Sequence, residues 1–286
     1  MAASADAAVL VGLGSDDDLP VVRLAAEEAA AHGRPLHLLH AFDWHAAFAA
    51  DTVAAPRDRA EGLITQAAQL AHEVEPGLTV RGEIVESAML RTLIRRSETA
   101  FLLAVGDSGM AASGECVPSE TPAVQLAARA GCPLLVVRRD PPPEGPVLVG
   151  VDGSPSSNLA LEWAFECAAR RYARLLALRV VEPDEDTDEI TDQLTEVVAR
   201  YAARRAEVPT ECRVVRGDPG AVLVDMSSSA QMALVAARGD EPGRGMLGAV
   251  AQSLLYHSPA PVVVVRGLTD MPLTGPAAHP ARDRRP

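Results

Sequence analysis

The sequence repeats itself once, and this internal repeat limits the folds that the chain can adopt. Each half contains short apolar runs that end in turns, and three of these runs recur in the same order. The pairs are residues 8–16 (AVLVGLGSD) with 146–154 (PVLVGVDGS), 101–106 (FLLAVG) with 233–237 (ALVAA), and 132–138 (CPLLVVR) with 260–266 (APVVVVR). A repeat of this kind predicts two tandem copies of one domain.

The boundary between the copies is expected in residues 139–145 (RDPPPEG), because three successive prolines cannot join a helix or a central sheet ladder. We therefore predict a first domain over residues 1–140 and a second over residues 141–268. The tail, residues 269–286, is rich in Pro, Ala and Arg and lacks periodicity, so we expect it to be flexible.

Within each half, apolar runs of strand length alternate with amphipathic segments, which is typical of β-α-β units and a parallel sheet covered on both faces. Helices are expected at residues 20–31 and 156–171. A third helix is predicted by the helical spacing of five apolar residues, Ile190, Leu194, Val197, Val198 and Tyr201. The chain is thus predicted to be an α/β protein with two doubly wound domains. The last strand of each half is apolar on both faces, and the other half is expected to cover it.

Composition excludes several classes of function. The formal net charge of -13 would repel a nucleic-acid backbone. No apolar run approaches the roughly 20 residues that a membrane helix needs, and the start MAASADAAVL lacks the layout of a secretory signal. We expect no nucleic-acid partner, no membrane span and a cytoplasmic location.

The chain contains no lysine, so all 26 residues of the Lys+Arg total are arginine. A Walker-type loop, a kinase catalytic lysine and a Schiff-base enzyme each need a lysine ammonium group. These three classes are therefore excluded.

Cysteines and histidines predict no metal site. Four cysteines are scattered without a CxxC pair and are expected to be buried thiols, namely Cys116, Cys132, Cys167 and Cys212. His37, His40 and His45 lie close together in the sequence, but strand alternation does not place them on one face.

Ligand chemistry is expected where strands end, because the crevice of an open parallel sheet lies beyond the carboxyl ends of its strands. In residues 149–157 (VGVDGSPSS), the strand is predicted to end at Asp152 and to pass through Gly153 into a helix. Residues 237–252 (ARGDEPGRGMLGAVAQ) form a glycine-rich loop in which Gly248 precedes another helix. Backbone amides at a helix N-terminus can bind phosphate without lysine.

Residues 149–157, the RGDP of residues 216–219, the glycine-rich loop and the closing HSPAPVVVVR of residues 257–266 together resemble the universal stress protein family. Two copies of its domain cover nearly the whole chain, from Ala8 to Gly267. The resemblance implies a five-stranded parallel sheet with strand order 3-2-1-4-5 and helices on both faces, similar to the adenine nucleotide alpha hydrolases. It also implies association of copies through their last strands.

For one branch of the family, the resemblance implies ATP bound by an aspartate after the first strand and by a G-x2-G-x9-G-[ST] loop after the fourth. The aspartate corresponds to Asp152, which would accept hydrogen bonds from the nucleoside end of the ligand. A turn or helix-capping role for Asp152 is the alternative.

The loop of the second half departs from this pattern. Ala236 replaces the first glycine, Gly248 comes one residue early, and Ala249 stands where a hydroxyl is expected. Gly239, Gly248 and the amides of Ala249 and Val250 could still bind phosphates, and the alternative is a plain loop-to-helix connection. The predicted nucleotide site comprises Gly150, Val151, Asp152, Gly153, Val235, Ala236, Gly239, Gly248, Ala249 and Val250.

The first half departs further from the pattern, and we expect no nucleotide there. The aspartate position is occupied by Gly14, which Ser15 and three aspartates follow. The loop keeps Gly106 and Gly109, but it places Glu115 and Glu120 near the expected phosphate charge.

Three functions are consistent with the sequence. The first is a non-enzymatic cytoplasmic stress-response protein whose second domain binds ATP, with magnesium, or another adenine nucleotide. The second is an interaction scaffold of the same fold without nucleotide, which Ala236 and Ala249 favour. The third is a weak ATP hydrolase with Asp240 or Glu241 as base or metal ligand. The two domains are expected to pair within the chain, and a homodimer of two chains is left open.

Overall fold

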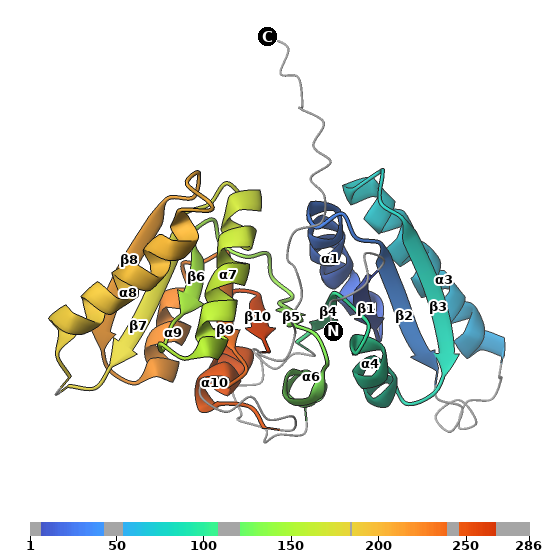
Figure 1. Cartoon of the computed structure of the whole chain (residues 1–286). Coiled ribbons are helices and arrows are strands. Elements are labelled where there is room, and N and C mark those ends of the chain that lie inside the picture. The colour runs from blue at the N-terminus through green and yellow to red at the C-terminus, as the bar shows by residue number, and fades with distance from the viewer. Residues whose placement is uncertain (1–6, 43–53, 108–120, 184, 239–245, 267–286) are drawn as a thin grey trace, which may run out of the picture.

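The computed structural model describes residues 7–42, 54–107, 121–183, 185–238 and 246–266, which form one ten-stranded sheet (Figure 1). The first half supplies β1 (Val9–Leu13), β2 (Leu36–Phe42), β3 (Val80–Glu86), β4 (Leu102–Gly106) and β5 (Leu134–Val137). The second half supplies β6 (Val147–Gly150), β7 (Leu175–Val181), β8 (Thr210–Arg216), β9 (Met232–Ala236) and β10 (Val262–Val265). The strand order is β3-β2-β1-β4-β5-β10-β9-β6-β7-β8, so each half has the expected order 3-2-1-4-5.

Helices cover both faces of this sheet. The first half contains a short 3-10 helix, η1 (Asp16–Asp18), followed by α1 (Leu19–Ala31), α3 (Ala54–Val74), α4 (Met89–Ser97) and α6 (Pro122–Arg129). The second half contains α7 (Pro155–Arg170), α8 (Thr187–Ala202), α9 (Pro219–Ser227) and α10 (Ala249–His257). One hydrophobic core lies under α1, α3, α7 and α8, and the other lies under α4, α6, α9 and α10. The sheet is therefore buried on both sides, as a doubly wound fold requires.

The predicted helices agree with the structure to within a few residues at their ends. Pro20 and Pro155 lie in the first turns of α1 and α7, where a missing N–H costs no helical hydrogen bond. The α8 residues Ile190, Leu194 and Val198 are buried, as their spacing predicts. The predicted strand end at Asp152 was wrong by two residues, because β6 ends at Gly150 and the chain then enters a turn.

The last strands join the two halves. β5 and β10 pair antiparallel, with Val136 opposite Val262 and Leu134 opposite Val264. All other paired strands of the sheet run parallel. The apolar last strand of each half is thus covered by its counterpart, as the sequence predicted, and the two halves are related by an approximate twofold axis.

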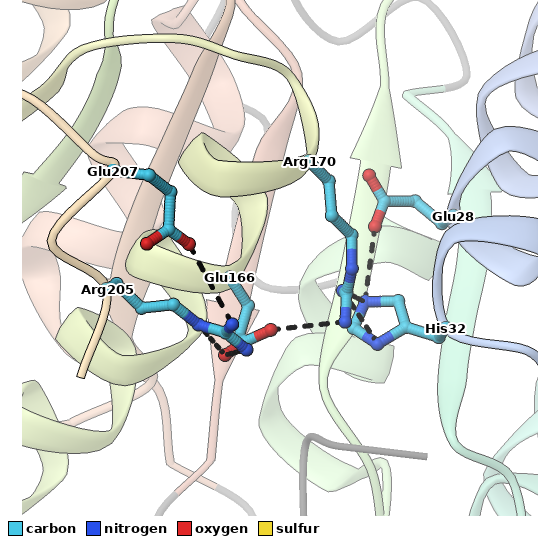
Figure 2. Close-up of polar contacts among 6 residues, drawn as sticks. All are labelled: Glu28, His32, Glu166, Arg170, Arg205 and Glu207. Atoms are coloured by element: carbon cyan, nitrogen blue, oxygen red, sulfur yellow. Dashed lines mark hydrogen bonds and ion pairs between the residues drawn. The ribbon is translucent and has the colours of Figure 1, made fainter. Parts of the chain in front are cut away.

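A largely buried ion pair also crosses between the halves, from Glu28 of α1 to Arg171 directly after α7, and beside it Arg170 contacts His32 (Figure 2). Glu28 of α1 lies 2.6 Å from Arg171, measured between Oε1 and Nη2. On the other side, Glu166 accepts hydrogen bonds from Arg170 at 3.1 Å and from Arg205 Nε at 2.8 Å. Burial would raise the pKa of Glu28, but Arg171 and His32 together hold it at about 2, so the carboxylate is ionised.

His32 lies at the centre of this contact. Its Nε2 is 3.5 Å from Glu28 Oε2, and its ring is next to the rings of Phe101 and Trp163, with centroids 4.5 and 5.6 Å away. Burial lowers the pKa of His32 below its usual value, so the ring is neutral at pH 7. The interface therefore combines a sheet ladder, an aromatic contact and buried charges.

Candidate functional site

A cavity of about 300 Å³ opens at the carboxyl ends of β6, β7 and β9, where the parallel-sheet rule places a ligand. Its lining includes all the predicted site residues except two: Gly150, Val151, Asp152, Val235, Ala236, Gly248, Ala249 and Val250. Gly153 does not line the cavity, although it belongs to the adjoining turn. Gly239 lies outside the described residues, as do Asp240 and Glu241. The structure thus brings together two segments that are about 100 residues apart in the chain.

The turn after β6 directs Asp152 toward this cavity. Asp152 Oδ1 accepts the backbone N–H of Ser154 at 2.9 Å, and Ser154 Oγ in turn accepts the N–H of Ser157 at 3.1 Å. Ser154, not Asp152, is therefore the cap of α7. In the alternative role suggested for Asp152, the helix cap is thus wrong and the turn is confirmed, while nucleotide binding by Asp152 stays a prediction.

Asp152 carries a negative charge at neutral pH. Partial removal from water would by itself raise the pKa of its carboxyl group, but hydrogen bonds from Ser154 and Ser157 outweigh this effect and lower the pKa. Gly153 follows with φ of +87°, and a Cβ there would lie 2.9 Å from Arg179 Nη1. Glycine is therefore favoured at this turn by its backbone conformation, whereas the contact with Arg179 involves only the far end of a flexible side chain.

The N-terminus of α10 forms the opposite wall. Gly248 is the N-cap, with extended backbone angles and no side chain to cap the helix, and its own N–H donates to Ala237 O at 2.8 Å. The N–H groups of Ala249 and Val250 open the helix and have no acceptor within it. Because both residues line the cavity, these amides and the positive end of the helix dipole can bind an anion there.

The structure also adds residues that sequence reasoning missed. An apolar wall is formed by Leu178, Val180 and Leu223, and Arg238 brings a cation to the mouth. The remaining additions are Ser157, Pro219 and Ala251. A signal existed for four of them, because they lie in segments already singled out: Ser157 in residues 149–157, Pro219 in the RGDP motif, and Arg238 and Ala251 in residues 237–252.

In the first half, a cavity of about 270 Å³ lies at the ends of β1, β4 and β5, on the α1 side of the sheet, and Asp18 is among its lining residues. Asp18 Oδ2 accepts the N–H groups of Gly14 at 2.7 Å and of Ser15 at 3.2 Å. A Cβ at Gly106 would lie 2.6 Å from Asp18 Oδ1. The Asp18 carboxylate therefore lies between the ends of β1 and β4, and its charge opposes an anionic ligand.

The expectation that the first half binds no nucleotide stays a prediction, and Asp18 adds a carboxylate near the ends of β1 and β4 that is consistent with it. Glu115 and Glu120, on which the expectation depended, lie outside the described residues. Asp18 was missed, although the spacing Ser15-x-x-Asp18 is a capping-box signal, and both hydrogen bonds of that box are present.

The other candidate residues have structural partners. His37 Nε2 lies 3.1 Å from Glu83 Oε2, and His40 Nδ1 lies 2.9 Å from Leu13 O, while His45 is outside the described residues. Among the residues that the structure describes, no group of three potential ligands is placed to hold a metal ion. Nor is any described helix both long and apolar enough to cross a membrane.

Two cysteines are buried, as predicted. Burial raises the pKa of Cys132 to about 12 and that of Cys167 to about 12, so both are unreactive thiols. Cys212 is only partly buried, and Cys116 lies outside the described part of the chain.

Comparisons with known proteins agree with this arrangement. The model of the universal stress protein family matches residues 7–138 and again residues 145–266. A universal stress protein of Mycolicibacterium smegmatis is 32% identical over 284 residues, which cover 90% of this chain and 96% of the relative. One from Mycobacterium tuberculosis is 31% identical over 289 residues, again covering 90% and 96%.

Among solved structures, the chain is similar to a universal stress protein from Archaeoglobus fulgidus. The TM-score is 0.70 at 17% identity, over 92% of this chain and 97% of that one. At this identity the structural likeness supports the fold alone.

Proposed function

Because the chain belongs to the universal stress protein family, we propose that its second domain binds an adenine nucleotide in the cavity between Asp152 and the N-terminus of α10. The observation that supports this most directly is the meeting of an ionised carboxylate, an apolar wall and uncapped helix amides around one cavity. Its volume lies at the lower end of the roughly 300–1,000 Å³ typical of small-molecule sites.

Each part of a nucleotide has a matching surface. The base would contact the apolar side chains of Leu178, Val180 and Leu223. Asp152 would accept hydrogen bonds from the nucleoside, and the amides of Ala249 and Val250 would donate to a phosphate. Since Ala249 provides no hydroxyl group, phosphate binding would depend on backbone amides and helix dipole, and we propose a weak, sensing type of affinity.

Magnesium would enter with the nucleotide. Asp152 is the sole carboxylate among the described residues that line the cavity, and it lies at the nucleoside end. A magnesium ion beside the phosphates would therefore be bound mainly by phosphate oxygens and water, which is a common arrangement for this ion.

We propose a binding function and not a catalytic one. Hydrolysis of ATP needs a base or a metal ligand near the phosphates. The candidates for that role, Asp240 and Glu241, are outside the described residues, so the hydrolase alternative depends on a direct assay. Turnover that disappears in Asp240→Ala or Glu241→Ala protein would establish it.

The remaining parts of the proposal concern the whole chain. We propose domains over residues 1–140 and 141–268, with a stress-response role in the cytoplasm. The tail of residues 269–286 lies outside the described residues, and association of two chains stays a prediction. An interaction scaffold that binds no nucleotide is the second candidate, favoured by Ala236 and Ala249.

Calorimetric titration of nucleotide-stripped protein with Mg-ATP tests the proposal. We expect one site per chain, an affinity at least tenfold weaker in Asp152→Asn protein, and unchanged affinity in an Asp192→Asn control. Asp192 is an exposed α8 carboxylate outside the cavity. Equal affinity of both variants would contradict the role of Asp152. An absence of heat together with no thermal shift at millimolar ligand would favour the scaffold.

A further inference from the structure

The two ends of α10 have different surroundings. Its N-terminal residues line the candidate nucleotide cavity, and its C-terminal residues lie at the contact between the halves. Besides α9, α10 contacts α6 of the first half, and the two helices lie side by side at the base of the molecule in Figure 1. With nine residues and about 1.5 Å of rise per residue, α10 is only about 13 Å long. A change at its C-terminal end therefore reaches the cavity.

The C-terminal end of α10 is held by an arginine of the first half. Arg138 Nη2 donates to Leu254 O at 2.8 Å, and Arg138 Nε donates to Ala260 O at 3.3 Å. Leu254 lies in the last turn of α10, where its carbonyl also accepts the N–H of Ser258 at 3.0 Å and a cation is favoured by the helix dipole. Arg138 thus fixes both the end of α10 and the turn that leads into β10.

Arg138 is itself held rigidly. Its residue is only 4% exposed, and Nη1 lies 3.4 Å from Oδ2 of Asp107, which directly follows β4 of the first half. A buried guanidinium group that has both a carboxylate and carbonyl partners has little freedom to move. The position of α10 is in this way tied to the sheet of the first half.

The approximate twofold axis provides a matched control. Arg266, which follows β10 as Arg138 follows β5, donates to Ala127 O in α6 of the first half. Arg266 is also buried, at 5% exposure. Both arginines therefore donate to a helix carbonyl across the same interface, but no residue of α6 lines the candidate nucleotide cavity, whereas three residues of α10 do.

We propose that Arg138 is a positioning residue for the nucleotide site of the second domain, and that this site is complete only when the first domain is docked against it. The inference rests on the proposed function. Arg138 does not touch the ligand; it acts through α10, by keeping the amides of Ala249 and Val250 directed into the cavity. This gives the first domain, which is not expected to bind nucleotide, a role in the affinity of the second.

The test compares Arg138→Gln, Arg138→Lys and Arg266→Gln in the full chain. Mg-ATP affinity is measured by calorimetry, and backbone hydrogen exchange is followed in the α6 and α10 segments. We expect Arg138→Gln to weaken Mg-ATP binding three- to tenfold and to speed exchange across α10. Arg266→Gln should leave affinity within twofold and speed exchange in α6 instead. Arg138→Lys, which keeps the charge, should recover part of the affinity.

The outcomes separate the inference from the proposed function. Equal affinity in Arg138→Gln and unmutated protein would overturn the inference, and so would an equal loss in both glutamine variants, which would indicate general loosening of the interface. If the unmutated protein binds no Mg-ATP, the proposed function fails, and the positioning role of Arg138 is then tested by hydrogen exchange alone. In that case, unchanged exchange at the N-terminal end of α10 in both Arg138 variants would overturn the positioning role, and faster exchange there would support it. If Arg138→Gln does not fold, Arg138→Lys replaces it in both the calorimetry and the hydrogen-exchange measurements.

Discussion

The guanidinium group of Arg170 lies over the imidazole ring of His32, with Nη1 2.9 Å from Nδ1 and 2.6 Å from Nε2. A nitrogen this close to both ring nitrogens cannot lie in the ring plane without overlapping the carbon between them, so Nη1 lies above one face of the ring. The pair joins α1 of one half to α7 of the other (Figure 2). A neutral ring suits this place, because a protonated ring would face a second cation.

From this contact we expect the free energy of unfolding to fall as the pH drops from 7 to 5. Burial lowers the pKa of His32 below its ordinary 6.5, Arg170 lowers it further, and the nearby carboxylates of Glu28 and Glu166 oppose this only in part. In the window between the folded pKa and 6.5, the unfolded chain binds more protons. The contribution of the neutral His32 ring to the free energy of unfolding is thus complete above pH 6.5. It is lost as the pH falls from 6.5 toward the pKa of His32 in the folded protein.

Urea unfolding at pH 7, 6 and 5 measures this effect. The pH dependence should be weaker in His32→Asn protein than in the unmutated protein. It should be retained in a His72→Asn control, since His72 is exposed on α3. An unchanged pH dependence in His32→Asn would show that His32 is not the titrating group.

Removing the carboxylate of Glu28 should be strongly destabilising. Its replacement in Glu28→Gln leaves Arg171 buried without its charge partner, and breaking a buried pair typically costs about 3–5 kcal/mol. The neighbouring exposed Glu27→Gln should change the free energy of unfolding by no more than about 0.5 kcal/mol. Chemical denaturation at pH 7 compares the two, and similar values would argue against the importance of the buried pair.

Tyr172 has a strained backbone that glycine would relieve. It adopts φ of +50° and is 91% exposed, and its N–H donates to Ala169 O just as the N–H of Gly33 donates to Ala30 O in the first half. We expect Tyr172→Gly to raise the free energy of unfolding by about 0.5–1 kcal/mol, because the relieved strain exceeds the added chain entropy.

The reverse change at the repeat position, Gly33→Ala, should lower the free energy of unfolding by about 1 kcal/mol. A Cβ at Gly33 meets no atom within 4 Å, so this cost reflects backbone conformation alone. If Tyr172→Gly proved destabilising, the exposed ring would have to contribute a contact that offsets the strain.

Restoring the missing hydroxyl should tighten nucleotide binding. Ala249 is the first residue of α10 and lines the cavity, so Ala249→Ser places a hydroxyl group beside the phosphate position. A hydrogen bond to a charged group contributes about 1.5–3 kcal/mol, so we expect an affinity gain of roughly tenfold for Mg-ATP. Gln252→Ser on the same helix is the control. No gain in Ala249→Ser would favour the scaffold.

Local periodicity explains why much of the architecture could be predicted. The apolar runs of strand length became the parallel strands, and the stripe of Ile190, Leu194 and Val198 became the buried face of α8. That Asp152 and Gly248 line the same cavity could be predicted, because the carboxyl ends of parallel strands lie at one edge of the sheet. The strand order came from the family resemblance and could not have been obtained from spacing alone.

Contacts between distant residues could not be predicted in this way. Asp18 carries a capping signal, but only the folded turn shows that its carboxylate lies against Gly106 at the end of β4. Likewise, an arginine after each last strand is visible in the repeat. The hydrogen-bond partner of Arg138 could not be read from the repeat, since Leu254 is 116 positions away and belongs to the other half.

The sequence by itself therefore determined two α/β domains, their pairing through the last strands, and the turns where a ligand would lie, because each depends on patterns within a few residues or on the repeat. The tertiary structure alone decided where the Asp18 carboxylate lies, which side chains form the interface between the halves, and how α10 is held. The last two depend on the docking of two complete domains, and contacts between residues more than 100 positions apart leave no periodic trace in the sequence.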